Sequence, residues 1–390
     1  TTDYASKLAP VRLEARLGEE RKDVIHDTLA LPAASRCHFS HDAPCQKACP
    51  TGIDVGRFIW DVAAGNVRGA ARTILSANVF GMTCARVCPT PSLCQGSCVL
   101  QYAGRRPVDI PGLQLFAVSR AREAGYDPFE TKPASGKRVA LVGSGPASLA
   151  CAHALALEGH HCTVFEARQM PGGLATFALA PYKLTCEQAL ADVEWVSRHE
   201  NIEVRCGVAV GLHVDVSDIL EEYDALFVGV GLGADTRLQI EGHALPGVVG
   251  ALELIERLKL ESADEVEDLD EVTDAMVIGG GATALDVAQE LKRLGIRNVT
   301  ILYRRDREQM PGHDHELDEA RRRGVAVRFL SMPTSYVAGP SGRVAGVQVA
   351  RCELGECGSD GRRTVSVVEG DETSLEAQLV AVAIGQKRPG

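Results

Sequence analysis

The sequence contains no long hydrophobic run. A helix that crosses a membrane needs roughly 18 to 20 consecutive apolar residues, and no stretch of that kind is present. The polar segment 1–20 also lacks the apolar core of a secretory signal. These two absences favour a cytoplasmic protein that makes no use of a membrane.

Basic residues are fewer than acidic residues in this sequence. The 41 Lys and Arg residues are outnumbered by 52 Asp and Glu residues, which gives a net charge of -11 with His neutral. Nucleic acids and anionic membranes are usually bound through basic surfaces, so this balance argues against both as partners. We expect the partners to be small molecules or proteins instead.

Compositional bias is also absent. Hydrophobic residues make up 45% of the chain and charged residues 24%, which excludes disordered, collagen-like and coiled-coil proteins. The length of 390 residues exceeds the roughly 250 to 300 residues at which a single core stops growing. The sequence therefore predicts a globular protein of two or three domains.

Cysteine, in contrast, is abundant and concentrated near the start of the chain. Seven of the 13 cysteines lie between Cys37 and Cys98. The odd total and the missing export signal argue against a set of disulfides and favour reduced thiols or metal ligands. The segment reads Cys37-x7-Cys45-x3-Cys49-Pro50 and then Cys84-x3-Cys88-Pro89-x4-Cys94-x3-Cys98.

This spacing is typical of an iron–sulfur site. A [4Fe-4S] cluster needs soft anionic ligands from short loops, and a proline after a cysteine stops a helix so that the backbone can wrap the cluster. Two such runs are more specific than one. A zinc site and buried thiols without a metal are the alternatives that these residues leave open.

Residues 1–128 have the pattern of a helical domain. Helical periodicity is present at 55–64 and 67–76, interrupted by Gly, Pro and Cys, and no clear strand is visible. A linker rich in Pro, Ser, Gly and Lys follows at 128–137. We therefore predict an N-terminal α-helical domain folded around a cysteine-bound group.

A βαβ unit begins at residue 138, with the strand RVALVG, the helix PASLACAHALALEG and the strand CTVFEA. Its loop has the G-x-G-x-x-small form, in which glycines allow a tight turn and let a pyrophosphate approach the helix N-terminus. Glu166 ends the second strand, where a carboxylate can accept both ribose hydroxyls. Gly172 and Gly173 indicate a close approach to a long ligand, which favours FAD over NAD. The loop residues are Gly143, Ser144, Gly145, Pro146, Ala147 and Ser148.

A second βαβ unit begins at residue 275, with AMVIGG, GATALDVAQELKRLG and NVTILYRR. It keeps the glycine turn, but its second strand ends in Arg304 and Arg305 where an acid would bind ribose. A carboxylate would repel a 2'-phosphate and guanidinium groups would pair with it, so the pattern favours NADPH over NADH. The alternative is that both arginines lie at the strand end without binding a ligand.

These patterns predict a multi-domain protein with an N-terminal α-helical iron–sulfur domain followed by two Rossmann-like α/β nucleotide-binding domains. The helical domain spans 1–128. The FAD-binding domain spans 138–250 and is continued by 360–390, because the strands expected late in the chain suit a return to an earlier sheet. The NAD(P)-binding domain spans 251–359. Further strands are expected at 202–205 and 225–229.

Several short stretches are more specific than the overall pattern. They are DAPCQKACPT at 42–51, TCARVCPT at 83–90, Leu93-Cys94 with Cys98, and Gly112-Leu113-Gln114 with Phe116-Ala117. With these stretches the sequence resembles the NAD(P)H-oxidising portion of dihydropyrimidine dehydrogenases and, more widely, the small subunits of glutamate synthase. The resemblance covers nearly the whole chain. In the dehydrogenases a Gln at the position of Gln114 ligates a cluster where most clusters have Cys.

The resemblance implies two [4Fe-4S] clusters, an FAD site and a site for NADPH or NADH. One cluster would use Cys37, Cys45 and Cys98, and the other Cys49, Cys88, Cys94 and Gln114. FAD would contact Gly143 to Ser148, Glu166, Gly172, Gly173, Leu174 and Lys183, the last of which replaces the family's usual Arg. The nicotinamide cofactor would contact Gly280, Gly281, Ala282, Thr283, Arg304, Arg305, Ala383, Ile384 and Gly385.

Two departures from the family are visible. The family's first motif is C-x2-C-x4-C-x3-C, and Ser40 replaces its second cysteine. Because an alkoxide is a harder and poorer ligand than a thiolate, the first cluster is expected to be ligated by Ser40, reduced to three irons, rescued by His41 or absent. Cys84 has no ligand role in the family pattern. Relatives also continue into a closing FAD-binding segment with a Gly-Asp pair, so we expect a shortened chain or weaker FAD binding.

The resemblance implies an FAD- and iron–sulfur-dependent NAD(P)H oxidoreductase that works as an electron-input subunit. Electrons would pass from NAD(P)H to FAD, through the clusters, and on to an FMN-binding partner subunit that reduces uracil or thymine to the 5,6-dihydro form. A hetero-oligomer is expected because no sequence remains for the FMN-binding barrel. Hydride transfer to a flavin needs no general acid or base, so no catalytic residue is assigned. The alternatives are a glutamate synthase small subunit and a non-catalytic scaffold that retained the fold.

Overall fold

The computed structural model describes residues 22, 24–260, 269, 271–359 and 361–387. These residues form two compact units. The first contains the described residues up to 231 apart from 180–182, and the second contains 180–182 and the described residues from 232 onward. The polar segment 1–20 lies outside the described residues. None of the helices in the described ranges is long and apolar enough to cross a membrane.

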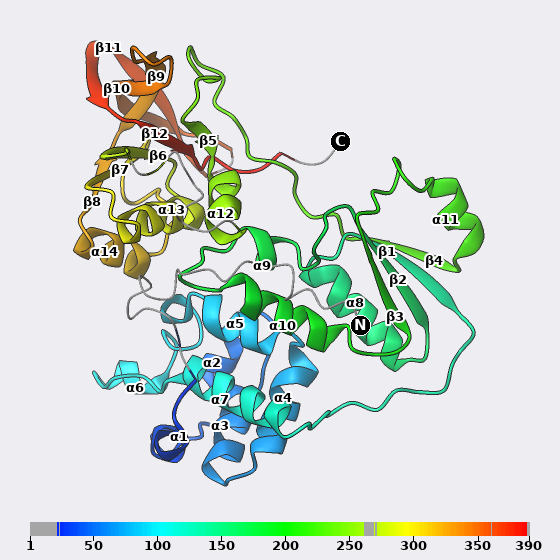
Figure 1. Cartoon of the computed structure of the whole chain (residues 1–390). Helices are drawn as coiled ribbons and strands as arrows, with labels where there is room; N and C mark the ends of the chain where they lie inside the picture. The colour runs from blue at the N-terminus through cyan, green and yellow to red at the C-terminus, as the bar shows by residue number, and fades with distance from the viewer. Residues whose placement is uncertain (1–21, 23, 261–268, 270, 360, 388–390) are drawn as a thin grey trace. The chain divides into compact units, whose positions relative to one another are not determined.

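The first unit begins with helices, and these confirm the predicted helical domain (Figure 1, blue to cyan). The helices observed at 55–63 and 67–77 agree with those expected at 55–64 and 67–76. The bounds are α1 (Asp27–Ala34), α2 (Pro44–Lys47), α3 (Val55–Ala63), α4 (Val67–Ala77), α5 (Gly81–Val87), α6 (Val99–Tyr102) and α7 (Ile110–Glu123).

Side-chain caps set the start of the longer helices. The Asp54 carboxylate accepts a hydrogen bond from the Arg57 backbone N–H at 3.0 Å, at the start of α3. The Asp109 carboxylate accepts one from the Gly112 backbone N–H at 3.2 Å, at the start of α7. Such caps satisfy N–H groups that have no partner within the helix. The caps therefore fix where the chain turns from the loops into the helices.

The helices α3, α4 and α7 pack on one another around a shared apolar core. Phe58, Ile59, Ile74, Leu75 and Leu113 are each at most 1% exposed. Burying a side chain of this size contributes roughly 1.5 to 3 kcal/mol. The core therefore provides a stable base for the loops that carry the cysteines.

The first unit also contains a four-stranded parallel sheet in the order β3-β2-β1-β4. The strands are β1 (Arg138–Val142), β2 (His161–Glu166), β3 (Ile202–Cys206) and β4 (Ala225–Val228). The associated helices are α8 (Pro146–Leu157), α9 (Leu174–Phe177), α10 (Cys186–Val196) and α11 (Val216–Glu222). The helix α8 lies against the sheet and contacts α10 (Figure 1). This is the first predicted βαβ unit, and β3 and β4 are the strands expected at 202–205 and 225–229.

The second unit is built on a five-stranded parallel sheet in the order β5-β12-β6-β7-β8. Its strands are β5 (Val248–Gly250), β6 (Asp274–Ile278), β7 (Asn298–Tyr303), β8 (Val325–Phe329) and β12 (Leu379–Val382). The helices are α12 (Ala251–Leu260), α13 (Ala282–Arg293) and α14 (Asp314–Arg322). The helix α13 joins β6 to β7, so this sheet contains the second predicted βαβ unit.

A separate antiparallel sheet is inserted between β8 and β12 (Figure 1, orange to red). Its strands are β9 (Ser331–Ala338), β10 (Val344–Cys357) and β11 (Arg363–Glu376), in the order β11-β10-β9. The chain returns from β11 directly to β12 in the parallel sheet. The hairpin between β10 and β11 is therefore an addition to the nucleotide-binding fold of this unit.

The last strands pair differently from the prediction for 360–390. The strand β11 pairs with β10, and β12 pairs in parallel with β5 and β6, so this segment continues the second unit rather than the FAD-binding domain. The strand β5 also belongs to the second sheet, although residues 248–250 fall within the range 138–250 predicted for the FAD-binding domain. The physical reason is that β12 is apolar and fully buried. Such a strand suits the interior of either parallel sheet, and its sequence does not choose between them.

Candidate functional site

The cysteines of the helical region sort into two groups of thiols. The first group consists of Cys37, Cys45 and Cys98, which line one small pocket together with Ser40. Cys45 lies on α2, and Cys98 is the N-terminal cap residue of α6. The structure therefore brings together the three predicted ligands of one cluster and Ser40, which replaces the second cysteine of the family's motif.

Burial and the closeness of the thiols to one another set the pKa values in the first thiol group. Burial, followed by the nearby thiols of Cys37 and Cys98, raises the pKa of Cys45 to about 11. Burial also raises the pKa of Cys37. Thiols of this kind ionise when a cationic centre binds among them, so loading the site releases protons. Adjacent thiolates require such a centre because their negative charges repel one another.

The second group consists of Cys49, Cys88 and Cys94. Burial raises the pKa of Cys94 to about 11, and the thiols of Cys49 and Cys45 contribute in the same direction. Cys88 is the residue that follows α5, and it interacts electrostatically with Cys94 and Cys49. This group contains the three cysteines that were predicted for the second cluster.

Two further polar groups lie beside Cys88. The Cys84 thiol, one turn earlier on α5, donates a hydrogen bond to the Cys88 sulfur and lowers the pKa of Cys88. The Lys22 ammonium donates a hydrogen bond to the Cys88 carbonyl oxygen at 2.7 Å. Burial lowers the pKa of Lys22, while the Cys88 and Cys94 thiols act in the opposite direction. Sequence reasoning missed Lys22 because it lies 66 positions from Cys88 and belongs to no motif.

Gln114 is buried on α7, and its side chain reaches the start of α5. Its Nε2 donates a hydrogen bond to the Gly81 carbonyl oxygen at 2.7 Å. This bond connects α7 to α5, the helix that Cys88 follows. The amide oxygen is the atom that a cluster ligand would have to supply, so the ligand role of Gln114 stays a prediction.

The donor set of both groups fits an iron–sulfur cluster. Each group presents soft sulfur donors from several loops, and these donors, once ionised, would need a positive centre between them. Within the described residues, no group of three His, Cys, Asp or Glu side chains is gathered to hold a single metal ion. All 13 cysteines lie in the described part of the chain, and none of them forms a disulfide.

The glycine loop after β1 leaves an open space at the N-terminus of α8. A Cβ atom on Gly145, the cap residue of α8, would meet no atom within 4 Å. Gly143 has a φ of +87°, and a Cβ atom there would lie 2.7 Å from the Gly229 carbonyl oxygen. Ser148 packs closely against Gly229 at the end of β4. The loop therefore fits a dinucleotide whose pyrophosphate approaches the helix N-terminus.

Glu166 is buried at the end of β2, and it organises this loop. One carboxylate oxygen accepts hydrogen bonds from the Ser144 backbone N–H, at 2.8 Å, and from the Ser144 hydroxyl. The other accepts one from the Arg168 backbone N–H at 2.9 Å. Because each oxygen has two lone pairs, the second oxygen can accept one further donor. In this arrangement Glu166 can accept one more hydrogen bond. The prediction from the sequence needs it to accept two, one from each ribose hydroxyl.

The glycine pair after β2 approaches the same loop. Gly172 and Gly173 have φ values of +110° and +56°, and a Cβ atom on Gly173 would lie 2.8 Å from the Gly145 Cα atom. Leu174, the first residue of α9, is 47% exposed. Lys183 lies in the same unit and interacts electrostatically with Lys22. The predicted FAD contacts in 143–148, Glu166 and the glycine pair are thus close together in space.

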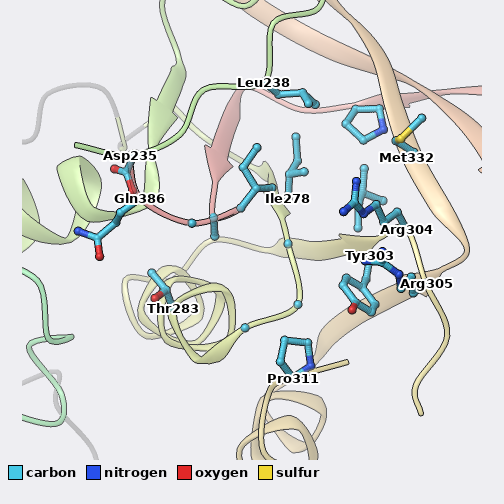
Figure 2. Close-up of a pocket in the computed structure, with 18 of the residues that line it drawn as sticks. Asp235, Leu238, Ile278, Thr283, Tyr303, Arg304, Arg305, Pro311, Met332 and Gln386 are labelled. Carbon is cyan, nitrogen blue, oxygen red and sulfur yellow. The ribbon is translucent and has the colours of Figure 1, made fainter. Parts of the chain in front are cut away.

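A cavity of about 520 Å³ lies in the second unit, at the C-terminal ends of β6, β7 and β12 (Figure 2). Its volume is in the range of small-molecule and cofactor sites. Ala282 is the one predicted nicotinamide contact that does not line it. The other eight predicted contacts, Gly280, Gly281, Thr283, Arg304, Arg305, Ala383, Ile384 and Gly385, all do.

Glycines allow the backbone to form this cavity. Gly279 has a φ of +138°, and a Cβ atom on it would lie 2.2 Å from the Ala383 carbonyl oxygen. A Cβ atom on Gly280 would lie 2.5 Å from the Tyr303 ring. Gly281, the cap residue of α13, faces open space, since a Cβ atom there would meet no atom within 4 Å. The N-terminus of α13 is therefore accessible to an anionic ligand.

The two predicted arginines differ in their environment. Arg304 is exposed at the edge of the cavity. Arg305 is 9% exposed, and its Nε donates a hydrogen bond to the Arg363 carbonyl oxygen at 3.0 Å. Arg304 is thus the freer guanidinium, and Arg305 is partly committed to the antiparallel sheet. Sequence reasoning missed other lining residues, among them Asp235, Met332 and Arg362, because they are remote from both glycine motifs.

Two family models match consecutive parts of the chain. Residues 15–126 match the family described as dihydropyrimidine dehydrogenase domain II, 4Fe-4S cluster. Residues 137–389, more than half of the chain, match the family described as pyridine nucleotide-disulphide oxidoreductase. The chain belongs to the pyridine nucleotide-disulphide oxidoreductases. This oxidoreductase depends on NAD(P)H and uses FAD and iron–sulfur clusters as cofactors.

Individual relatives of this oxidoreductase carry different names. The glutamate synthase [NADPH] small chain of Escherichia coli (strain K12) is 34% identical over 359 residues, which cover 90% of this chain and 76% of that protein. The NAD-dependent dihydropyrimidine dehydrogenase subunit PreT of the same strain is 34% identical over 301 residues, which cover 77% of this chain and 71% of that protein. These relatives confirm the resemblance predicted from the sequence.

A solved structure supports the fold of the nucleotide-binding part. FprA of Mycobacterium tuberculosis, in complex with NADPH, aligns with a TM-score of 0.56 and 24% identity, over 66% of this chain and 73% of that chain. At this identity the likeness concerns the fold alone. It agrees with the two Rossmann-like α/β folds that the sequence predicted.

Proposed function

We propose that this chain is the electron-input subunit of a dihydropyrimidine dehydrogenase. In this role it oxidises NAD(P)H at FAD and delivers electrons through two [4Fe-4S] clusters to an FMN-binding partner. The partner reduces uracil or thymine to the 5,6-dihydro form. The observation that carries the proposal is that both thiol groups and the first glycine loop belong to one compact unit.

The helix α5 links the second thiol group to the FAD-type fold. It ends at Val87, just before Cys88, and packs against α10. Thr83 of α5 donates hydrogen bonds to the buried Asp192 carboxylate of α10, from its backbone N–H at 2.8 Å and from its hydroxyl at 2.6 Å. The helix α10 in turn contacts α8, which begins at the glycine loop. This connection would hold a cluster and a flavin at a fixed separation, as electron transfer between them requires.

The residues of the chain have binding and orienting roles in this proposal. Cys37, Cys45 and Cys98 hold the first cluster with Ser40 beside them, and Cys49, Cys88, Cys94 and Gln114 hold the second. The loop 143–148 and Glu166 bind FAD, and the 520 Å³ cavity binds the nicotinamide cofactor with Arg304 near its phosphates. When bound, the nicotinamide supplies a hydride, the flavin accepts it, and the clusters carry single electrons.

The pyrimidine branch is favoured by two stretches that this chain shares with dihydropyrimidine dehydrogenases. These are DAPCQKACPT at 42–51 and the Gln114 position on α7. The PreT relative is by its name a subunit of such an enzyme, which supports a hetero-oligomer. A glutamate synthase small subunit is the second candidate, because that relative is 34% identical over 90% of this chain.

A reconstitution experiment tests the proposal. The chain, loaded anaerobically with FAD, iron and sulfide, is mixed either with the FMN-binding subunit of a dihydropyrimidine dehydrogenase or with a glutamate synthase large subunit. We expect uracil reduction that depends on NADPH or NADH in the first mixture and no glutamate synthesis in the second. The Cys94→Ala variant, which lacks one thiol of the second group, is expected to retain flavin and lose uracil reduction.

The outcomes separate the candidates. Glutamate synthesis in the second mixture without uracil reduction in the first would assign the chain to the other branch. A chain that binds neither flavin nor iron under these conditions would contradict both assignments and favour a scaffold that kept the fold.

A further inference from the structure

The antiparallel sheet forms one wall of the 520 Å³ cavity. Ser331, Met332 and Pro333 contribute from the start of β9, and Arg362 contributes from the hairpin between β10 and β11. Figure 2 shows Met332 on the same side of the cavity as Arg304 and Arg305. The inserted sheet therefore borders the cavity at the C-terminal end of β7, the second strand of the βαβ unit.

Two hydrogen bonds fix the residue next to Arg362. The Arg363 backbone N–H donates to the Gln309 side-chain oxygen at 2.9 Å. The Arg363 carbonyl oxygen accepts from Arg305 Nε at 3.0 Å. Both partners lie on the segment just after β7, so the hairpin is anchored beside the strand end that carries Arg304. These bonds hold the backbone of the residue next to Arg362 beside the end of β7.

The charges lining the cavity are separated. Arg304, Arg305 and Arg362 are its cationic lining residues, and Asp235 is its one acidic lining residue among those described. The Asp235 carboxylate accepts hydrogen bonds from the backbone N–H groups of Leu252, at 2.9 Å, and Glu253, at 3.2 Å. Figure 2 shows Asp235 on the opposite side of the cavity from Arg304. The arginine side is therefore suited to an anionic group on a bound ligand.

We propose that Arg362 is a second specificity residue for the 2'-phosphate of NADPH, supplied by the antiparallel hairpin in addition to Arg304 of the βαβ unit. The inference rests on the proposed nicotinamide site in this cavity. Two guanidinium groups from different elements can pair with different oxygens of one phosphate, and charge-assisted bonds of this type are strong. NADH lacks the phosphate and would gain nothing from Arg362.

The test uses the flavin-loaded chain and compares Arg362→Gln, Arg362→Lys and Arg304→Glu with the wild type. The control is Arg351→Gln, which removes an exposed arginine of β10 that pairs with Asp371 at 3.6 Å and does not line the cavity. Affinity is measured for NADPH and NADH by flavin reduction, and for 2',5'-ADP and 5'-AMP by calorimetry, which needs no electron transfer. Thermal unfolding checks that each variant is folded.

We expect Arg362→Gln to weaken NADPH and 2',5'-ADP by about tenfold, equivalent to about 1.4 kcal/mol, and to leave NADH and 5'-AMP unchanged. Arg362→Lys should retain most of the preference, and Arg351→Gln should retain all of it. Equal losses for the phosphorylated and unphosphorylated ligands in a folded Arg362→Gln protein would overturn the inference. So would an unchanged preference in Arg362→Gln when Arg304→Glu abolishes it.

Failure of the underlying site gives a different result. If the wild type binds neither 2',5'-ADP nor 5'-AMP and its flavin is not reduced by either nicotinamide, the proposed function fails, and the inference about Arg362 fails with it. If the wild type reduces its flavin and prefers NADPH, the proposed site stands, and only the Arg362 comparison decides the inference.

Discussion

At the position of Ser40 the chain offers a hydroxyl where its neighbours in the first thiol group offer sulfur. Serine needs to lose a proton of much higher pKa than a thiol, and the resulting oxygen is a harder ligand than iron in a cluster prefers. The cluster proposed for the first thiol group is therefore the one whose loading should be limited by a single side chain.

We expect Ser40→Cys to raise the ratio of iron to protein after anaerobic reconstitution, because a fourth thiolate would complete the site. The measurement is iron and acid-labile sulfide on the same sample as protein concentration. The matched control is Ser35→Cys, which adds a thiol at the end of α1, outside the thiol pocket. An equal rise in both variants would point to nonspecific iron binding, and no rise in Ser40→Cys would show that the serine is not limiting.

Lys22 places a cation beside the second thiol group, with its hydrogen bond to the Cys88 carbonyl. A reduced cluster carries one more negative charge than an oxidised one, so a nearby cation stabilises the reduced state. We expect Lys22→Met to lower the midpoint potential of the cluster proposed for the second thiol group and to leave that of the cluster proposed for the first group unchanged. A redox titration followed by electron paramagnetic resonance measures both potentials.

The control for this prediction is Lys47→Met. Lys47 lies on α2 and pairs with the exposed Asp42 at 2.6 Å, so solvent screens its charge. Its replacement should move neither potential by as much. If Lys22→Met and Lys47→Met shift the potentials equally, or if Lys22→Met raises a potential, the charge of Lys22 does not act as argued.

At the scale of helices, Asp192 joins three of them. Its carboxylate accepts hydrogen bonds from Thr83 of α5 and pairs with Arg122 of α7 at 2.6 Å, although Asp192 itself lies on α10. The Asp192 side chain is 1% exposed and that of Arg122 is 15% exposed. A charge this well buried is stable only with its partners in place.

We expect Asp192→Asn to lower the free energy of unfolding by about 3 kcal/mol, because Arg122 would be left as a buried charge without its counterion. Urea unfolding followed by circular dichroism measures the change. Asp127→Asn is the comparison, since Asp127 pairs with Arg198 at the surface and its loss should cost less than about 1 kcal/mol. Similar losses in the two variants would mean that the buried network contributes no more than a surface ion pair.

The elements that could be predicted from the sequence are those with a local signal. The apolar periodicity at 55–64 and 67–76 indicated α3 and α4, and the strand patterns at 202–205 and 225–229 indicated β3 and β4. The sheet of β12 could not be predicted, because pairing depends on partners more than 100 residues away, such as β6. Arg362 and Lys22 could not be predicted for the same reason, because the site residues that they lie near in the structure are remote in the sequence. The glycine loops and the cysteines could be predicted because their spacing is a local signal.

At the scale of the whole molecule, the two compact units divide the chemistry. The first contains both thiol groups and the FAD-type loop, and the second contains the nicotinamide-type cavity. If the second unit governs nicotinamide binding and the thiol groups govern the later transfer of single electrons, a defect in one should leave the other function intact. Arg304→Glu belongs to the second unit and Cys94→Ala to the first, so the two variants should fail at different steps.

We expect the flavin of Cys94→Ala to be reduced by NADPH within about twofold of the wild-type rate, because the second unit and the FAD-type loop are untouched. The same variant should lose the paramagnetic signal of one cluster. Arg304→Glu should keep the wild-type iron content and the flavin, yet need at least about tenfold more NADPH for half-maximal flavin reduction, since a carboxylate repels the 2'-phosphate. Stopped-flow absorbance and electron paramagnetic resonance on the same preparations measure the two steps. A folded, flavin-loaded Cys94→Ala protein with slow flavin reduction would show that the thiol group also governs the nicotinamide step, and the division of labour between the units would then be wrong.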